Sequence, residues 1–212
     1  MLHNSKKMTS SSIVQEDVLP EQILEAALQL YLQYGLKKVT MNDVANRIGK
    51  SRSVLYYYYK DKNEIFDAVM DMLIREIVNE IGQKVSEVTS LKNKLRTFCL
   101  MKIKTSEARK PVFTALEAGM DSDEISLHTQ IMHNNHKRMM QAESALLSKI
   151  LSESIRNGEI RRLKPQEQKT LILFLLSSVR GIKREMERES DFSKLSSVID
   201  MFSEMIIKWL SV

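Results

Sequence analysis

Residues 40–62 have the sequence TMNDVANRIGKSRSVLYYYYKDK, which predicts two short helices separated by a sharp turn. Thr40 can cap the first helix with its hydroxyl, and Asp43 stands three residues later, where a carboxylate completes a capping box and meets the positive end of the helix dipole. Gly49 should end this helix, because glycine readily takes the positive φ found just after a helix. Ser51 can cap a second helix, so the stretch is interpreted as a helix-turn-helix.

The second helix carries four consecutive tyrosines, Tyr56 to Tyr59. Successive side chains on an α-helix differ by about 100° in direction, so the four rings cannot all be buried. Leu55 and Tyr59 are four residues apart and are predicted to face inward, which leaves Arg52 and Tyr56 on an outward face. Such a face suits DNA, because arginine pairs bidentately with guanine and tyrosine hydroxyls bond phosphates. The alternative is that the tyrosines only pack within a small domain, which the helical geometry disfavours.

Basic residues concentrate around this turn. Seven lysines and arginines but only two acids lie between Gly35 and Lys62, a local net charge of +5. The whole chain of 212 residues also has a formal net charge of +5, so the excess of positive charge is concentrated in this stretch. A compact basic patch around a turn between two helices is the electrostatic pattern of a protein that binds nucleic acid.

Two consecutive motifs link this stretch to a known family. Residues 40–49 follow the pattern T-x-x-x-V-A-x-x-I-G, and residues 49–66 follow G-x-S-R-x-x-L-Y-Y-Y-Y-K-x-K-x-E-I-F. Over Pro20 to Leu73 the chain resembles the TetR family of bacterial transcriptional regulators, although Tyr59 stands where phenylalanine is more usual. The resemblance implies DNA contacts from ten residues: Thr40, Asn42, Lys50, Ser51, Arg52, Ser53, Tyr56, Tyr57, Tyr58 and Lys62. It also implies an all-helical homodimer with a DNA-binding head and a larger body that dimerises and binds a ligand.

Residue patterns along the chain predict an all-α fold of about nine helices in three parts. Residues 1–18 are mostly polar and are expected to be a disordered tail. Residues 19–64 should form a helix-turn-helix domain whose first helix begins near Pro20, and residues 65–212 the ligand-binding and dimerisation domain. Further helix ends are expected at Gly82 and at Pro111.

Composition limits the class of protein. The chain is 43% hydrophobic and 28% charged, with six glycines and three prolines, which is ordinary for a globular protein with long helices. Its longest apolar run, Leu171 to Leu176, is far shorter than the roughly 20 residues of a membrane span. No signal peptide is evident, and the single cysteine allows no internal disulfide, so a cytoplasmic protein without membrane association is expected.

The body of the chain carries apolar stripes rather than motifs. Residues 166–189 and 192–210 should form two helices that meet their symmetry mates in a four-helix dimer interface. We expect that interface to contain Leu171, Phe174, Leu175, Phe202, Ile206 and Trp209. The family resemblance also implies a ligand pocket among the middle helices, for which the candidates are Phe98, Met101, Met120, Met132, Met139 and Phe174. Methionine adapts to varied apolar ligands, but ordinary core filling explains these residues as well.

Residues that could carry chemistry have simpler interpretations. His133 and His136 could share a metal ion, but His128 lies on a different side of the predicted helix and no further ligand completes a familiar set. Solvated or pocket-lining polar residues are therefore the favoured interpretation of the three histidines, and no metal or cofactor is expected. Cys99 could be a redox sensor beside Arg96 and Lys102, although a buried cysteine is the better interpretation. No catalytic arrangement stands out, and an enzyme is not expected.

These observations favour a dimeric, sequence-specific transcriptional regulator, which we expect to be a repressor released from double-stranded operator DNA by a small-molecule effector. Arg52 and Tyr57 are the candidates for base readout, and Tyr56, Tyr58 and Lys62 for phosphate contacts. Two alternatives remain at this stage: a DNA-organising protein without a ligand sensor, and an enzyme with an accessory DNA-binding head.

Overall fold

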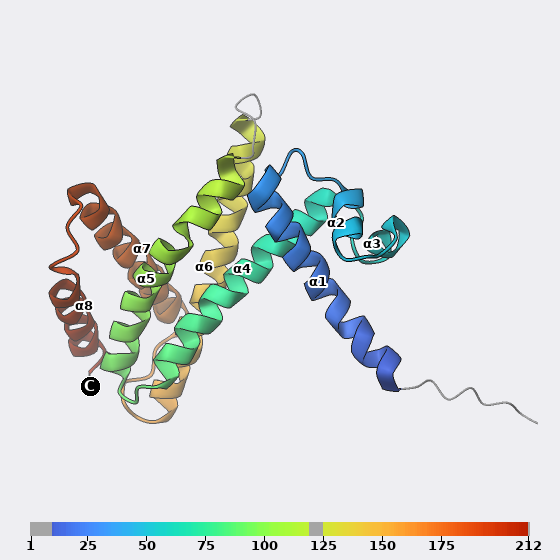
Figure 1. Cartoon of the computed structure of the whole chain (residues 1–212). Coiled ribbons are helices and arrows are strands. Elements are labelled where there is room, and N and C mark those ends of the chain that lie inside the picture. The colour runs from blue at the N-terminus through green and yellow to red at the C-terminus, as the bar shows by residue number, and fades with distance from the viewer. Residues whose placement is uncertain (1–9, 119–124, 212) are drawn as a thin grey trace, which may run out of the picture. The chain divides into compact units, whose positions relative to one another are not determined.

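A computed structural model describes residues 10–118 and 125–211, which form eight α-helices and no strand (Figure 1). The helices are α1 (Ser10–Tyr34), α2 (Met41–Arg47), α3 (Arg52–Tyr58), α4 (Lys62–Ser86), α5 (Leu91–Ala118), α6 (Ile125–Arg156), α7 (Pro165–Glu189) and α8 (Leu195–Leu210). The predicted all-α class is confirmed. None of these helices, within the described residues, is long and apolar enough to cross a membrane.

The chain divides into two compact units, which we call the head unit and the body unit. The head unit comprises residues 1–72 and 112–128, and the body unit comprises residues 73–111 and 129–212. The helices α4, α5 and α6 each contribute residues to both units, so the division falls within helices and not in linkers.

The core of the head unit forms where α1 meets the first half of α4. Ile23, Ala27 and Tyr31 recur at helical spacing along α1 and are buried. The ring of Tyr31 packs edge-on against Phe66 of α4 with centroids 5.9 Å apart, and its hydroxyl donates to the carbonyl of Lys62 at 3.4 Å. This packing fixes the two helices that flank the helix-turn-helix.

Proline and glycine end fewer helices than the sequence analysis predicts. The helix α1 starts at Ser10, ten residues before the predicted start at Pro20, so residues 10–18 of the predicted tail are helical. The predicted end at Gly82 is wrong, because α4 continues to Ser86. The predicted break at Pro111 is also wrong, because α5 runs unbroken through it, and the described residues form eight helices where about nine were expected. An interior proline removes one backbone hydrogen bond, which packing along a long helix can offset.

The body unit is a bundle built around buried leucine, isoleucine and phenylalanine side chains. Phe98 of α5, Leu147 of α6, Leu176 of α7 and Ile199 of α8 are all buried in it. A polar contact joins one of its loops to the start of α5. The Glu159 carboxylate accepts a hydrogen bond from the backbone N–H of Leu91 at 2.9 Å and so caps that helix.

Candidate nucleic-acid interface

The first helix of the candidate interface, α2, begins in the predicted capping box. The backbone N–H of Thr40 donates to Asp43 Oδ2 at 2.9 Å, and the backbone N–H of Asp43 donates back to Thr40 Oγ1 at 3.3 Å. The Thr40 hydroxyl also donates to the same carboxylate at 2.7 Å, and these bonds lower the pKa of Asp43. Val39 and Val44 are buried on either side of the cap. The start of α2 is therefore held by both hydrogen bonds and apolar contact.

The turn between the two helices depends on Gly49. Its φ is +65°, and a Cβ added there would meet no atom within 4 Å, so the backbone angle and not crowding requires glycine. The backbone N–H of Lys50 then donates to the carbonyl of Ala45 at 3.0 Å, which closes the turn. Ser51 is the residue before α3, as predicted, and its backbone is extended, but its hydroxyl makes no capping hydrogen bond.

The recognition candidate α3 presents its tyrosines as the helical geometry predicts. Leu55 is fully buried, and Tyr59, the residue after the helix, is half-buried. In contrast, 81% of Tyr57 and 44% of Tyr56 are exposed. The rings of Tyr57 and Tyr58 contact each other edge-on, with centroids 5.0 Å apart.

Arg52 and Tyr56 form a pair on the outward face of α3. The Arg52 guanidinium donates to the Tyr56 hydroxyl at 2.7 Å and lies 5.2 Å from the centre of its ring. This cation–π contact holds an exposed arginine in one orientation without neutralising its charge. The surface of α3 can therefore offer a positioned guanidinium beside two exposed phenol groups.

All ten residues expected to contact DNA lie in the head unit. Thr40 and Asn42 lie at the start of α2, Lys50 and Ser51 in the turn, the next five on α3, and Lys62 at the start of α4. Tyr58 and Lys62 are half-buried and the other eight are exposed. The Lys62 ammonium lies 3.4 Å from the carbonyl of Lys37, to which it donates. Whether each of these residues touches DNA stays a prediction.

The head unit also contains a groove that was not predicted from the sequence. It has a volume of about 710 Å³ and its lining includes Gln33, Lys38 and Arg47. The Arg47 guanidinium donates to the side-chain oxygen of Gln33 on α1 at 3.3 Å. Arg47 is therefore directed toward α1, and its sequence position within the basic patch gave no sign of this contact.

The residues expected at a dimer interface separate into two groups. Leu171, Leu175 and Ile206 are buried within their own unit, whereas 53% of Phe174 and 49% of Trp209 are exposed. These residues, except Leu175, line an apolar groove of about 550 Å³ between α7 and α8, together with Phe202 and Met205. The Arg161 guanidinium lies 4.8 Å from the centre of the ring of Trp209, which is one of the residues that line the groove.

The candidate ligand-pocket residues are spread through the body unit. Phe98 is buried on α5, and Met101 and Met139 are half-buried on α5 and α6. Phe174 lies instead in the groove between α7 and α8, which none of these three residues lines. Met120 and the side chain of Met132 lie outside the described residues.

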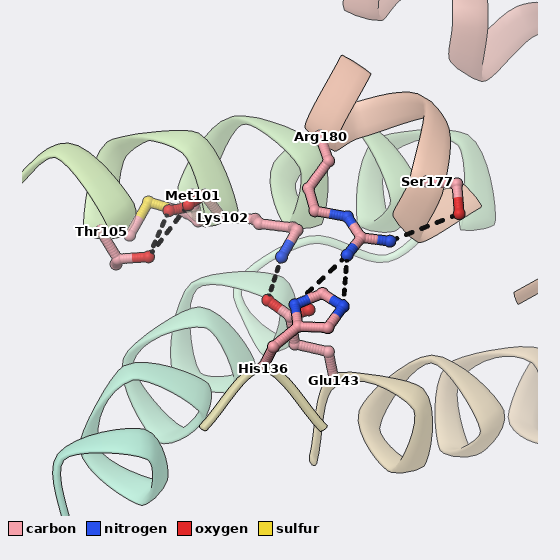
Figure 2. Close-up of polar contacts among 7 residues, drawn as sticks. All are labelled: Met101, Lys102, Thr105, His136, Glu143, Ser177 and Arg180. Atoms are coloured by element: carbon pink, nitrogen blue, oxygen red, sulfur yellow. Dashed lines mark hydrogen bonds and ion pairs between the residues drawn. The ribbon is translucent and has the colours of Figure 1, made fainter. Parts of the chain in front are cut away.

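A polar cluster in the body unit was also missed from the sequence. Lys102 of α5 forms an ion pair with Glu143 of α6, and Arg180 of α7 contacts the ring of His136 on α6 (Figure 2). From the sequence, His136 was interpreted as a solvated or pocket-lining polar residue, and a metal ligand was the less favoured alternative. Within the part of the chain that the structure describes, no three histidine, cysteine or acidic residues are placed to hold a metal ion, and the side chain of His128 lies outside it.

Cys99 is buried in the body unit. Burial raises the pKa of its thiol to about 12, although Lys102 acts in the opposite direction. The thiolate is the reactive form of cysteine, so a redox sensor at Cys99 is disfavoured and a packing role fits better.

Comparison with known proteins identifies the helix-turn-helix. Residues 23–69, which run from the second half of α1 to the first part of α4, match the family described as bacterial regulatory proteins, tetR family. The helix-turn-helix domain of this chain belongs to the TetR family. The protein is a DNA-binding transcriptional regulator, as the sequence motifs around Gly49 and Arg52 indicated.

Relatives extend the likeness beyond this domain. The transcriptional regulator BetI of Cronobacter sakazakii is 23% identical over 158 residues, covering 74% of this chain and 73% of BetI. A transcriptional regulator from Cytophaga hutchinsonii shares the fold with a TM-score of 0.55 and 21% identity, covering 92% of this chain and all of that one. The regulator FadR of Bacillus subtilis, solved in complex with stearoyl-CoA, shares it with a TM-score of 0.51 and 14% identity, covering 88% of this chain and 97% of FadR.

Proposed function

We propose that this TetR-family protein is a cytoplasmic, homodimeric repressor that binds a near-palindromic operator and leaves it when a small, largely apolar effector binds the body unit. The observation that carries the proposal is the outward face of α3, where Arg52, Tyr56 and Tyr57 are exposed within a basic surface. A protruding helix of this kind fits the major groove of DNA, which admits one α-helix.

Within this interface, we assign base readout to Arg52 and Tyr57. Arg52 is exposed and oriented by Tyr56, and an oriented guanidinium can reach guanine O6 and N7 together. Tyr57 is the most exposed of the four consecutive tyrosines Tyr56 to Tyr59, and its ring can contact a thymine methyl group. Tyr56, Tyr58 and Lys62 are assigned to phosphates, which would supply most of the affinity through counterion release.

The apolar face of α7 and α8 supports pairing with a second copy of the chain. Phe174, Met201, Met205 and Trp209 are about half exposed or more, which is unusual for large apolar side chains on two adjacent helices. Two such helices from each protomer would form a four-helix interface. The operator should then contain two half-sites about 34 Å apart, or one helical turn of DNA.

The pairing is tested by Phe174→Glu, which places a charge in the apolar groove. The matched control is Leu32→Glu, which makes the same kind of change at an exposed leucine of α1 in the head unit. Sedimentation should show a dimer for the original protein and the control, and a monomer for Phe174→Glu. A Phe174→Glu protein that stays dimeric would refute the use of this face.

The effector is expected to be largely apolar because the buried side chains of the body unit are mainly leucine and isoleucine, with Phe98 among them. FadR of Bacillus subtilis, which shares the fold, was solved with stearoyl-CoA, a ligand that carries a long apolar chain. The effector would stabilise a dimer whose head spacing no longer fits the operator. Its effect is limited by the difference between its affinities for the two conformations.

Selection of bound fragments from a random DNA library tests the DNA-binding part of the proposal. The expected result is an inverted repeat whose half-sites are separated by about one helical turn. Fragments without a shared motif would indicate a DNA-organising protein instead. Release of the selected DNA by an apolar compound, without chemical change of that compound, would support the regulator over an enzyme.

A further inference from the structure

The body unit contains an ion pair where its helices would otherwise bury apolar side chains. Glu143 of α6 is 2% exposed and pairs through Oε1 with the Lys102 ammonium of α5, which is also largely buried (Figure 2). Thr105, one turn further along α5, is 2% exposed and donates its hydroxyl to the carbonyl of Met101 at 2.8 Å. Burying two charges costs several kcal/mol per ion before their attraction offsets the cost, so such a pair is weak evidence for stability. A buried ionic group beside further charged groups is instead a candidate for a binding site.

Hydrogen bonding at Glu143 is incomplete. Its second oxygen, Oε2, is buried and has no hydrogen-bond partner among the described residues. A buried carboxylate oxygen without a donor is energetically unfavourable, and most buried polar atoms in folded proteins have partners. A ligand that places an N–H or O–H group against Oε2 would supply the missing bond.

The positive charge of Arg180 on α7 has no carboxylate partner among the residues that the structure describes. Its guanidinium nitrogen Nη1 lies 2.6 Å from Nε2 and 3.3 Å from Nδ1 of His136, and Nη2 donates to the Ser177 hydroxyl at 3.4 Å (Figure 2). Among the described residues no carboxylate forms an ion pair with Arg180. Burial and the nearby charges of Arg180, Lys102 and His133 lower the pKa of His136, which favours the neutral ring, and a neutral ring does not offset the charge of Arg180.

The cluster therefore has an excess of one positive charge: Lys102 and Arg180 against Glu143. We propose that these three residues bind the head group of an amphipathic carboxylic acid that carries a hydroxyl or N–H donor next to its carboxylate. The carboxylate replaces His136 as the partner of Arg180, because a guanidinium forms shorter and stronger bonds to a carboxylate than to a neutral ring. The donor bonds Glu143 Oε2, and the alkyl chain lies among the apolar side chains of the body unit. This inference rests on the proposed function, since it names the chemical class of the effector.

Four compounds with ten carbon atoms each separate the contributions: decanoate, its α-hydroxy derivative, decanol and decylammonium. Each is titrated into the full-length protein below its micelle concentration, with binding followed by calorimetry and by the shift in melting temperature. The expected order of affinity is α-hydroxydecanoate, then decanoate, then decanol. Decylammonium should bind most weakly because it meets the two cations. Equal binding of decanol and decanoate, preference for decylammonium, or no binding by either acid would overturn the proposal.

Variants in α7 assign the binding to the cluster. Arg180→Gln should reduce the affinity for α-hydroxydecanoate by about 10- to 100-fold, the range expected for loss of charge-assisted hydrogen bonds, and leave decanol binding unchanged. Arg184→Gln is the matched control, because it removes the same charge from an exposed position one turn along α7. Glu143→Gln should remove the preference for the α-hydroxy acid over decanoate. If Arg180→Gln kept the advantage of the acids over decanol, the head group would lie elsewhere.

Titration of the DNA-bound protein with the same compounds distinguishes failure of this inference from failure of the proposed function. Binding of the acids through Arg180 without release of the selected DNA would support the head-group site and refute the effector role. Release by decanol alone would refute the head-group site and support the regulatory function.

Discussion

Replacing Arg52 by alanine separates base recognition from general attraction to DNA. Arg52 is exposed, and its side-chain contacts are with Tyr56, so the folded head unit should lose less than about 0.5 kcal/mol. If Arg52 binds a guanine bidentately, the variant should lose about 1–3 kcal/mol of binding free energy on the preferred operator, which is about 5- to 150-fold in affinity. On an operator mutated at the contacted base pair the loss should be much smaller, because the specific contact is already absent.

The control for this experiment is Arg47→Ala. It removes the same charge from the same basic surface, but Arg47 is directed toward Gln33 on α1. In gel-shift titrations at fixed salt, Arg47→Ala should weaken binding to both operators by a similar factor. Arg52→Ala should change the ratio between them. The assignment of Arg52 to base readout is refuted if the ratio of affinities for the two operators is the same in Arg52→Ala as in the original protein. Because Arg52 and Tyr56 are in contact, Tyr56→Phe and Arg52→Ala are not expected to be additive.

Three further changes test other parts of the structure. Lys62→Ala should weaken binding to all DNA sequences alike and reduce the slope of log affinity against log salt by about 1, as measured by titrations at several salt concentrations. Thr40→Ala removes both the hydroxyl that caps α2 and its bond to Asp43, and should lower the free energy of unfolding by about 1 kcal/mol in urea denaturation; an unchanged midpoint at unchanged slope would contradict the role of the cap. The pKa of His136 is lowered from its ordinary 6.5, so the unfolded chain binds a proton more readily than the folded one, and stability should fall as pH decreases below about 6.5. His136→Gln should show a smaller decline in melting temperature over that range, and an identical decline would show that another group is responsible.

The helix-turn-helix was predictable because its determinants are local. The capping box of Thr40 and Asp43 joins residues three apart, and the positive φ of Gly49 is set by the turn itself. The outward direction of Tyr57 follows from helical geometry once Leu55 is placed inside. Each of these features needs only the neighbouring residues, which is why the sequence analysis and the structure agree there.

Glycine and proline within the long helices were misleading because packing outweighed their local preference. An interior glycine costs about 1 kcal/mol relative to alanine, yet α4 continues past Gly82 because Ile81 and Val85 on either side of it are buried. The position of a Cβ at Gly82 lies 3.7 Å from the Leu146 side chain of α6, so the helix packs closely there. Contacts between residues more than sixty positions apart cannot be inferred from a window of sequence.

The polar cluster of the body unit was unpredictable for the same reason. Lys102 and Glu143 are 41 residues apart, and Arg180 is 44 residues from His136. In sequence each is one charged or polar residue on an amphipathic helix, where the usual position is solvent. Only the packing of α5, α6 and α7 shows that Glu143 is buried and that Lys102 pairs with it.

The energetics of the proposed switch require both parts of an amphipathic effector. Changing a protein from mostly DNA-bound to mostly released, from 99:1 to 1:99, takes a difference of about 5.5 kcal/mol between the effector's affinities for the two conformations. Charge-assisted hydrogen bonds to Arg180 would contribute about 1.5–3 kcal/mol, so a head group alone falls short. The remainder must come from the alkyl chain, at about 0.8 kcal/mol for each buried CH₂ group. Short-chain hydroxy acids should therefore bind through Arg180 without releasing DNA, and release should appear only once several CH₂ groups are added. If the shortest acids released DNA as fully as the longest, the head group itself would drive the switch and this division of the free energy would be wrong.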